Sequence, residues 1–595
     1  MDDHSFAPFK QSLLKDLETE THQSEMESYD PQSAILTSSK RIREDDSSER
    51  QTSTPMTPNH KKIKDNDAAA QRRVSLSPNS SQTLPQSDSL QQLQTQLLYE
   101  QRSGAGTTVF TYNPHNLNAT PTPIHTTISH YGTQNLQASH FRYMFHSLDE
   151  RAQALDDHLQ HLQQAYFDTE DISNYEAMGV PKQDSVSVIG RICNDAHTGR
   201  LHPTSVLLEG PRHQNGTRVS LRLDAVSDSY SLFPGQIVKV EGMNASGRSM
   251  VAKSMTEGSP LPFPKTKVKE LMQFQHLGDA QGRPLGILTA CGPFTTNANL
   301  EYEPLFDFIM GTVKAETPNV VILMGPFVDL RQPLLQSPSV KVSVEEEDGS
   351  RTMSVSHETL FVAKITNLLE QLYEEAPDCK TQFVLVPSVD DAISEPVFPQ
   401  PPMTDRIPNG KEPKLPHAEG MELGTLFLDP LNTNPSSPKI HCVSNPCTLQ
   451  INELVIGVTS TDTLLHISSE EINSKLMGNR MSRIAQHLIQ QQSYYPLFPP
   501  PMTGNANLDL TKLDHLKLPC TPDILLVPSK LAPFCKNVLG CMVMNPGFLS
   551  KGMTGGTFAS MNVHPMERAT LEELDGDVEM EHTVSERIRV DIKKI

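Results

Sequence analysis

Runs of consecutive hydrophobic residues recur along the second half of the chain, and each run ends at or near a turn of Gly, Pro or Asn. The runs cover residues 285–290, 320–324, 382–386, 448–458, 525–527 and 541–544. Amphipathic helical patterns separate them at residues 304–314, 358–374 and 480–491. Because buried strands that alternate with helices are typical of layered folds, we predict an α/β domain over residues 261–595, with the later strands as the second half of a β-sandwich.

Strand patterns are shorter between residues 183 and 260. They cover residues 186–192, 205–208, 219–223, 237–241 and 250–254, with turns such as Asn215-Gly216 between them. Five short strands in about 75 residues are typical of an OB barrel. Such a barrel binds single-stranded nucleic acid when aromatic residues line a basic groove. Only Tyr230 and Phe233 lie together near a turn, so we favour a barrel that contacts protein.

One helix is predicted ahead of the barrel, within a helical linker at residues 136–182. Its apolar residues fall at steps of three and four on a single stripe: Leu148, Ala152, Leu155, Leu159, Leu162 and Tyr166. Ser147 and Glu150 have the spacing of a capping box at its first turn. We expect the stripe to pack against the barrel.

Three further segments interrupt these patterns. Residues 331–355 and 399–440 are rich in charge or in Pro, Asn and Gly, which predicts surface loops. The segment 494–500 is hydrophobic but too rich in proline for a central strand. It is either a loop that closes the α/β core or part of a partner surface, and we favour the core.

Residues 1–135 are rich in Ser, Thr, Gln, Asn and Pro and predict a mostly disordered arm. Its basic clusters are candidate nuclear localisation signals, or else solvated linker charge: Lys40, Arg41, Arg43, Lys61, Lys62, Lys64, Arg72 and Arg73. Hydroxyls that precede proline are candidate phosphorylation sites: Thr54, Thr57, Ser77, Thr120 and Thr122. Phosphate beside the basic clusters would weaken their contact with acidic partners.

The net charge and the cysteines of the chain argue against some classes of function. The 595 residues carry a formal net charge of -21, which argues against broad contact with the phosphate backbone of DNA. The eight cysteines contain no Cys-x-x-Cys pair, so we predict buried thiols rather than a zinc site. No apolar run approaches the length that spans a bilayer, so we expect a soluble, intracellular protein with no membrane partner.

The strand ends of the α/β domain lack the ligands of a two-metal phosphoesterase. The strand 320–324 leads into Gly325-Pro326, where such an enzyme has Gly-Asp-x-x-Asp, so proline replaces the first carboxylate and Asp329 stands as the second acid. The other strand ends carry Cys291, Ser388, Ser529 and Asn545, which do not form a set of hard-metal ligands. Helix capping and turns explain nearby Asp390, Asp391 and Asp462. We therefore predict no catalytic, cofactor-binding or metal-binding residue.

A series of longer motifs occurs in one order. They are Phe233-Pro234-Gly235-Gln236, Ala290-Cys291-Gly292-Pro293-Phe294-Thr295-Thr296, Met324-Gly325-Pro326-Phe327-Val328-Asp329, Val386-Pro387-Ser388, Tyr494-Tyr495-Pro496-Leu497, Asn545-Pro546-Gly547 and Gly555-Gly556-Thr557-Phe558-Ala559. Over residues 140–595 the chain resembles the B-subunit family of replicative DNA polymerases, in the form found in the polymerase alpha–primase complex.

The resemblance implies a multidomain α+β and α/β protein. An OB-fold β-barrel would pack on an inactivated calcineurin-like metallophosphoesterase β-sandwich with flanking helices, behind the disordered N-terminal arm. It implies a non-catalytic nuclear subunit that binds the C-terminal region of the polymerase alpha catalytic subunit. Primase subunits would be reached through the complex, and DNA indirectly or weakly, to support priming of replication. The alternatives are an OB-type single-stranded DNA-binding protein and a residual metallophosphoesterase.

Overall fold

A computed structural model describes the chain from Tyr99 to Ile595, apart from residues 117–125, 133–142, 144–145, 171, 173, 197–198, 278–281, 338–339, 347–348, 404–425, 427, 429–430, 432–437, 476–477, 503 and 505. All of these described residues belong to one compact unit. The helices within them include none that is long and apolar enough to cross a membrane.

Five strands close into the barrel that the sequence predicts. They are β3 (Lys182–Asn194), β4 (Val206–Glu209), β5 (Arg218–Arg222), β7 (Ile237–Asn244) and β8 (Ser249–Thr256), in the closed order β3-β4-β5-β8-β7. The turn between β4 and β5 contains Asn215 and Gly216, both with positive φ, which these two residue types tolerate. The OB barrel is thereby confirmed.

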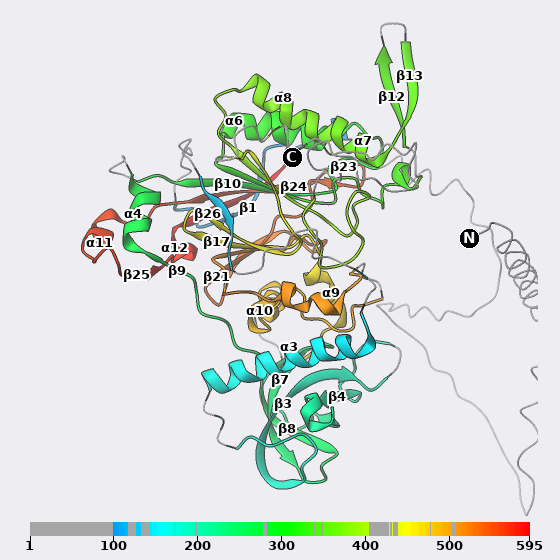
Figure 1. Ribbon diagram of the computed structural model, residues 1–595, viewed down its shortest axis with the longest axis vertical. Helices are drawn as coiled ribbons and strands as arrows, with labels where there is room; N and C mark the ends of the chain where they lie inside the picture. Colours follow the sequence, from blue (N-terminus) through cyan, green and yellow to red (C-terminus); the bar gives the residue numbers. More distant parts are fainter. Residues whose placement is uncertain are drawn as a thin grey trace, which may run out of the picture. The chain divides into compact units, whose positions relative to one another are not determined.

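The predicted helix is α3 (Leu148–Thr169), and it lies along the barrel (Figure 1). Ser147 and Glu150 form both hydrogen bonds of the capping box. Leu159 and Leu162 pack with Ile189 and Ile237 of the barrel strands β3 and β7. The cap and the packing on the barrel are confirmed, but the stripe only in its second half, because Leu148 and Ala152 are exposed.

Two sheets make up the rest of the unit. The seven-stranded sheet has the order β1-β26-β24-β10-β11-β14-β15, and the six-stranded sheet has the order β2-β16-β17-β19-β21-β20. The bounds in the first are β1 (Thr108–Tyr112), β10 (Leu285–Cys291), β11 (Val320–Met324), β14 (Gln382–Val386), β15 (Ile440–Cys442), β24 (Thr557–Val563) and β26 (Ile588–Lys594). Those in the second are β2 (Ile128–His130), β16 (Cys447–Ile451), β17 (Leu454–Val458), β19 (Ile524–Leu526), β20 (Phe534–Val538) and β21 (Cys541–Asn545).

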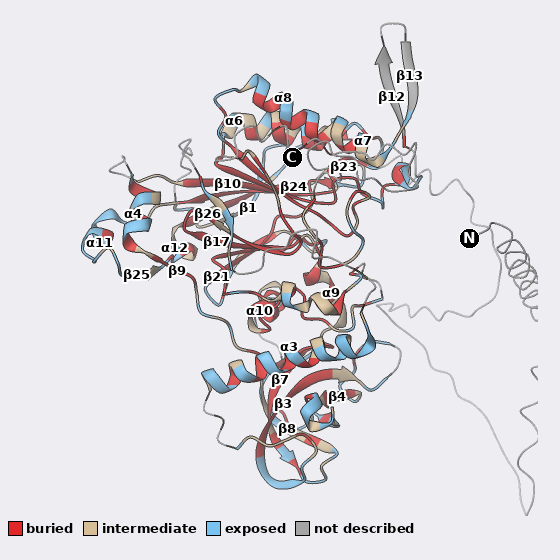
Figure 2. Cartoon of the chain, viewed as in Figure 1, coloured by how far each residue is buried: buried red, intermediate tan, exposed pale blue. Residues whose placement is uncertain are grey.

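The two sheets pack face to face, and helices cover their outer faces. Ile287 and Ile322 of the first sheet share one buried cluster with Ile456 and Met542 of the second. The strands of both sheets are mostly buried (Figure 2). The first sheet is covered by α5 (Glu303–Phe306), π-helical η5 (Asp307–Val313), α6 (Lys314–Glu316), α7 (His357–Phe361), π-helical η7 (Val362–Thr366) and α8 (Asn367–Glu375). The second is covered by α9 (Thr463–Glu470) and α10 (Arg480–Gln490). The layered α/β fold is confirmed, whereas its origin in metallophosphoesterases stays a prediction.

Smaller elements complete the described part of the chain. Two-stranded pairs form between β6 (Tyr230–Leu232) and β18 (Ile472–Ser474), between β9 (Lys265–Lys267) and β25 (Glu579–Glu581), and between β22 (Ser550–Lys551) and β23 (Thr554–Gly555). The remaining helices are η2 (Tyr99–Gln101), η4 (Arg212–Gln214), α4 (Val268–His276), η6 (Pro333–Leu335), η10 (Leu510–Leu516), α11 (Arg568–Glu572) and α12 (Val584–Arg587).

The predicted extent of the disordered arm, residues 1–135, is wrong at its end. β1 pairs with β26 and β2 pairs with β16, so both strands belong to the two sheets. The stretch Thr108-Val109-Phe110-Thr111-Tyr112 has the β-branched and aromatic residues of a strand, but its surroundings are rich in polar residues. Its pairing partner lies nearly 500 positions away in the sequence, at the C-terminal strand.

The prediction of surface loops is also partly wrong. Within residues 331–355, β12 (Val340–Glu346) and β13 (Gly349–Val355) form an antiparallel hairpin. The alternation Val340-Lys341-Val342-Ser343-Val344 was the signal for it. Within residues 399–440, Met403, Leu426 and Leu428 are buried in the core cluster of the first sheet. These apolar residues pack against the buried strands and helices of the first sheet, which composition alone does not reveal.

Candidate functional site

The ends of β10 and β11 form two Gly-Pro turns that pack against each other. The N–H of Gly292 donates to the carbonyl of Met324 at 2.8 Å. A Cβ atom on Gly292 would lie 1.9 Å from the carbonyl oxygen of Pro326. The thiol of Cys291 is buried and donates to the carbonyl of Gly325 at 3.4 Å, and burial raises its pKa. The two turns therefore pack through backbone atoms at Pro326, the position at which a two-metal phosphoesterase has its first carboxylate.

Asp391 ties this pair of turns to the end of β14. One carboxylate oxygen accepts from the N–H groups of Phe327 and Val328, and the other accepts from the N–H of Ser388 at 3.0 Å. The side chain is almost fully buried, and burial raises the pKa of Asp391 to about 8 against the opposing effect of these three hydrogen bonds. Its acceptor capacity is used by the backbone, so its role in this structure is to position loops.

The neighbouring acids have similar roles. Asp329 forms a backbone bridge with Asp391, and its carboxylate accepts from the N–H of Arg331 at 2.9 Å. Burial raises the pKa of Asp329. Asp390 forms an ion pair of 2.5 Å with Arg331. Turn formation and ion pairing thus account for acids that sequence reasoning weighed as ligands.

At the second sheet, the side chain of Asn545 holds the loop at Ser529 through hydrogen bonds to its backbone. The amide oxygen of Asn545 accepts from the N–H groups of Ser529 and Gly547, both at 2.9 Å. Its amide nitrogen donates to the carbonyl of Leu531 at 3.0 Å. Asp462 caps α9 and also accepts from the N–H of Lys530 at 2.9 Å.

The structure therefore brings Cys291, Pro326, Asp329 and Ser388 together at one strand-end cluster, and pairs Ser529 with Asn545 in another. Among the residues that the structure describes, no three His, Cys, Asp or Glu side chains converge as a metal site. The candidate localisation and phosphorylation residues, from Lys40 to Arg73 and from Thr54 to Thr122, lie outside the described residues.

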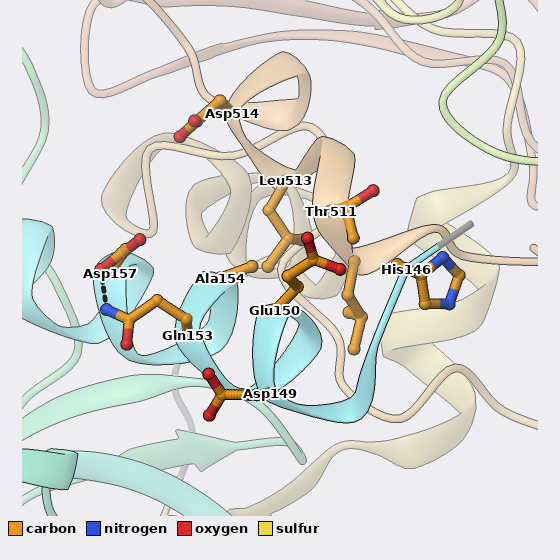
Figure 3. A pocket seen from close by; sticks show the side chains of 10 residues that line it. His146, Asp149, Glu150, Gln153, Ala154, Asp157, Thr511, Leu513 and Asp514 are labelled. Atoms are coloured by element: carbon orange, nitrogen blue, oxygen red, sulfur yellow. Dashed lines mark hydrogen bonds between the residues drawn. The ribbon is translucent and has the colours of Figure 1, made fainter. Parts of the chain in front are cut away.

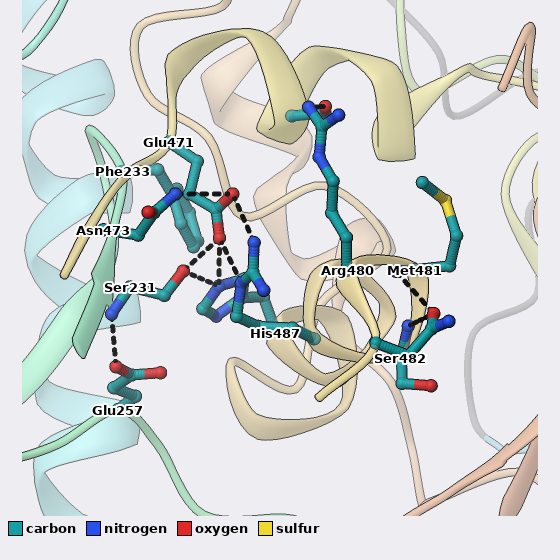
Figure 4. A network of polar contacts seen from close by, with 12 residues as sticks. Ser231, Phe233, Glu257, Glu471, Asn473, Arg480, Met481, Ser482 and His487 are labelled. Carbon is teal, nitrogen blue, oxygen red and sulfur yellow. Dashed lines mark hydrogen bonds and ion pairs between the residues drawn. The ribbon is translucent and has the colours of Figure 1, made fainter. Parts of the chain in front are cut away.

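Sequence reasoning missed a buried polar network that joins the barrel to the sandwich (Figure 4). Glu471, between α9 and β18, accepts from Nε of Arg483 at 2.7 Å and from the hydroxyl of Ser231 on β6. The same hydroxyl lies 2.8 Å from Nε2 of His487. Although burial acts in the opposite direction, hydrogen bonds from His487, Arg483 and Ser231 hold the pKa of Glu471 well below its usual range.

A second set of hydrogen bonds between the sandwich and the barrel is formed by Gln491, the residue that follows α10. The side-chain amide of Gln491 donates to the carbonyls of Ile237 and Glu257, and its oxygen accepts from the N–H of Ile237 at 2.8 Å. All of these Gln491 contacts reach the barrel strands or the segment that follows them. Nothing in the spacing of Glu471 and Gln491 marks them in the sequence, because Ser231, Ile237 and Glu257 lie more than 200 positions earlier.

The hydrophobic segment 494–500 closes the core at this junction. Tyr494, Tyr495 and Leu497 are all at most 2% exposed. The N–H of Phe498 donates to the carbonyl of Pro234 in the barrel at 3.0 Å, and a Cβ on Gly235 would lie 2.3 Å from the nitrogen of Phe498. The core-closing role is confirmed, and the same segment also abuts the barrel.

The two aromatic residues considered for base stacking are not on the surface. Phe233 is fully buried and its ring meets the ring of His487 edge to face at 5.0 Å. Tyr230 is 8% exposed. Both rings therefore pack inside the protein, where no nucleic-acid base reaches them.

An acidic cleft of about 460 Å³ lies between the start of α3 and η10 (Figure 3). Its lining residues include Asp149, Glu150, Asp157 and Asp514 but no Lys or Arg. Several are engaged: Asp149 pairs with Arg212 at 2.8 Å, and Asp514 pairs with Lys517 at 2.7 Å. Two of its acids are therefore offset by ion pairs, and its lining offers no Lys or Arg to the phosphates of nucleic acid.

Comparison with known proteins gives consistent matches. Residues 287–536 match the family of the B subunit of DNA polymerase alpha/epsilon, and residues 147–258 match the OB domain of the DNA polymerase alpha B subunit. The chain is 34% identical over 435 residues to the DNA polymerase alpha B subunit of Rattus norvegicus, which covers 73% of this chain and 63% of the rat protein. It is 33% identical over 447 residues to the Schizosaccharomyces pombe protein of that name, with 73% of this chain and 69% of the relative covered.

The Saccharomyces cerevisiae protein of the same name is 28% identical over 503 residues, covering 76% of this chain and 65% of the relative. The matched part thus spans less than two thirds of the rat and budding-yeast relatives. The matches include both the barrel and most of the two-sheet fold.

Proposed function

The chain belongs to the family of DNA polymerase alpha B subunits, and from that premise we propose that it is a non-catalytic scaffold of the polymerase alpha–primase complex. It binds the C-terminal region of the polymerase catalytic subunit and supports the priming of DNA replication. Primase subunits are reached through the complex, and DNA indirectly or weakly. The two-sheet domain is an inactivated metallophosphoesterase.

One observation supports the scaffold role above the others. The barrel and the sandwich share a buried ion-pair network at Glu471 and three hydrogen bonds to Gln491. Buried polar groups that pair with one another favour one relative arrangement, since any other leaves charges unpaired. A protein built in this way presents a rigid surface across two domains, which is what an obligate partner needs.

The test is co-expression of the full chain with the C-terminal region of the catalytic subunit. We expect a one-to-one complex that survives high salt, because obligate interfaces are large and rather apolar. A matched sample contains only the barrel and its helix, residues 147–258. Equal binding by that fragment, or no binding by the full chain, would show that the proposed interface is wrong.

The two alternative functions have direct tests. Manganese-dependent cleavage of a chromogenic phosphodiester by the purified chain would contradict the non-catalytic role, which rests on strand ends filled by backbone and on carboxylates that already accept hydrogen bonds. A salt-sensitive gel shift with single-stranded DNA would favour the nucleic-acid role. We expect no gel shift, because Phe233 and Tyr230 are buried, and no cleavage, because the strand-end carboxylates already bind backbone.

The protein is expected in the nucleus. Replacing Lys40, Arg41, Arg43, Lys61, Lys62 and Lys64 by alanine should reduce nuclear accumulation of the chain expressed alone, measured by fluorescence microscopy. Alanine at Lys551, Lys593 and Lys594 provides a comparison outside the clusters. If the cluster variant accumulates as before, the clusters are linker charge or the chain enters with a partner.

A further inference from the structure

The acidic cleft lies where the barrel meets the sandwich (Figure 3). One wall is the first half of α3, whose second half packs on the barrel. The other wall is η10, whose residues Leu513 and Leu516 pack in the core of the second sheet. The volume of about 460 Å³ is typical of ligand pockets, which form preferentially at domain interfaces. A ligand in the cleft therefore contacts both domains.

The cleft combines an apolar interior with an acidic rim. Ala154, Leu510 and Leu513 line its deeper part, because they are buried or half-buried. The charged residues of the lining are exposed acids at its rim: Asp149, Glu150, Asp157 and Asp514. An occupant that fits this lining has an apolar surface with cations beside it.

Two of the rim acids are not offset by a cation. Glu150 accepts from the N–H of Ser147 at 2.6 Å, and Asp157 accepts from the side-chain amide of Gln153 at 2.7 Å. Neither forms an ion pair with a lysine or arginine of the described residues, unlike the other two acids of the rim. Glu150 and Asp157 are seven positions apart on α3, which is about 10 Å along its axis. Cations two turns apart on a partner helix have the same spacing.

A buried carboxylate at the cleft wall also lacks a donor. Asp509 is 4% exposed, and its Oδ1 accepts from the N–H and the hydroxyl of Thr511 at 3.0 and 2.8 Å. Nδ1 of His146 lies 3.8 Å from the same oxygen, and both His146 and Thr511 line the cleft. Oδ2 of Asp509 has no hydrogen-bond partner among the described residues. A buried acceptor without a partner is costly, so a donor that enters from the cleft would stabilise it.

The charge of the cleft selects the class of partner. Phosphates need Lys or Arg, which the lining lacks, and bases need aromatic rings to stack on, which the lining also lacks. A basic, partly apolar protein segment matches both the rim and the interior. A helix is the form that lies along a groove and inserts side chains at steps of three, four and seven residues.

We propose that the acidic cleft binds one face of an amphipathic helix of a partner protein. Its apolar side chains contact Leu510 and Leu513, its lysines or arginines pair with Glu150 and Asp157, and one cationic donor reaches Asp509. This contact is additional to the proposed contact with the polymerase catalytic subunit and does not rest on it.

The test measures the fluorescence anisotropy of a labelled synthetic peptide mixed with the full chain. The probe is a helix of about 18 residues, or five turns, with leucine along one face and lysine beside it at positions seven apart. A matched peptide has glutamate in place of every lysine. We expect only the lysine peptide to bind, and its binding should weaken as salt is added because the rim acids are exposed.

Glu150→Gln combined with Asp157→Asn removes both charges but keeps the acceptors for Ser147 and Gln153. This double variant should bind the lysine peptide about three- to tenfold more weakly, since two exposed ion pairs are lost. Asp509→Asn should also weaken binding, because the amide nitrogen that replaces Oδ2 cannot accept.

Glu573→Gln combined with Glu579→Gln is the control for net charge, since both acids are exposed and lie outside the cleft. It should leave binding unchanged. Denaturant unfolding of each variant checks that the fold is intact.

Failure of the lysine peptide to bind overturns the proposal, and so does equal binding of the glutamate peptide. Equal affinities of the cleft variant and the control variant would show that the peptide binds elsewhere on the acidic surface. A single-stranded oligonucleotide that displaces the peptide would assign the cleft to nucleic acid. Dimerisation of the chain that the cleft variant abolishes, measured by analytical ultracentrifugation, would assign it to a second copy. Either result contradicts the proposed partner.

Discussion

At the scale of single residues, the strand ends of the α/β domain show carboxylates and glycines used to hold backbone. Asp391 accepts from three N–H groups on two loops, and Asn545 binds the loop after β19 in the same manner. Gly292 and Gly325 lie where a side chain would collide with neighbouring atoms. These residues stabilise the turns because each satisfies backbone groups that would otherwise be buried without partners.

Asp391→Asn should lower the free energy of unfolding by about 1–3 kcal/mol, because the amide nitrogen cannot accept from the N–H of Ser388. The loss should also depend on pH. Burial raises the pKa of Asp391 in the folded protein to about 8, so its stabilising contribution is complete below the unfolded pKa of about 4 and declines as pH rises through 8. The difference between the two proteins should therefore shrink as pH rises from 4 toward 8, and it changes sign once the fall, at most about 1.4 kcal/mol per unit, exceeds the initial loss.

Urea unfolding at several pH values measures this difference. Asp390→Asn, a change at the adjacent surface ion pair with Arg331, is the matched comparison. A constant difference between the original chain and Asp391→Asn across this range would show that the carboxyl group is not shifted as described.

Gly292→Ala should destabilise the fold by about 1–3 kcal/mol or more, because its Cβ would lie 1.9 Å from the carbonyl of Pro326. Gly311→Ala is the control, since nothing lies within 4 Å of a Cβ at that exposed helical position. It should be neutral or slightly stabilising, as alanine favours helix over glycine. Thermal unfolding measures both variants. Equal melting temperatures for Gly292→Ala and Gly311→Ala would show that the Gly-Pro turns are not closely packed.

At the scale of elements, hydrogen bonds and packing decide how neighbouring units join. The second half of the α3 stripe packs on the barrel and a capping box begins the helix, so its position follows from local signals. The junction of β6, β18 and α10 differs, because a buried charged cluster connects segments far apart in the sequence. Such a cluster stabilises only when every member is present.

Glu471→Gln should lower the free energy of unfolding by about 1–3 kcal/mol, because it leaves the partly buried guanidinium of Arg483 without its carboxylate. Glu470→Gln, one position earlier and outside the network, should change it by less than about 0.5 kcal/mol. Limited proteolysis at the segment between barrel and sandwich provides a second measurement, since a weakened junction opens more often. Equal stability of the two variants would mean that the network does not lock the domains together.

At the scale of the whole molecule, strands from both ends of the described chain complete the first sheet. β26 at the C-terminus lies between β24 and β1. β2 extends the second sheet beside β16. The sandwich therefore depends on residues that lie ahead of the barrel in the sequence.

A chain that begins at residue 133 should be less stable and more prone to aggregate than one that begins at residue 99, because loss of β1 and β2 exposes the edges of β26 and β16. Denaturant unfolding and light scattering measure the two effects. The chain starting at residue 99 keeps both strands and serves as the control. Equal behaviour of the two truncations would show that β1 and β2 contribute little to the sheets.

The sequence by itself determined the elements whose signals are local. Periodicity predicted α3 and the barrel, and runs such as Val320–Met324 predicted the buried strands. These features depend on side-chain alternation, on caps and on residue chemistry within a few positions.

Only the tertiary structure decided the rest. β1 and β2 could not be predicted because their ladders join residues hundreds of positions apart, and the polar stretches around them are typical of disorder. The network of Glu471, Arg483 and Ser231 and the backbone contacts of Asp391 also required three dimensions. An aspartate that binds a metal cannot be distinguished in the sequence from one that binds backbone. Its role is set by the groups that the fold brings within hydrogen-bond distance of its carboxylate.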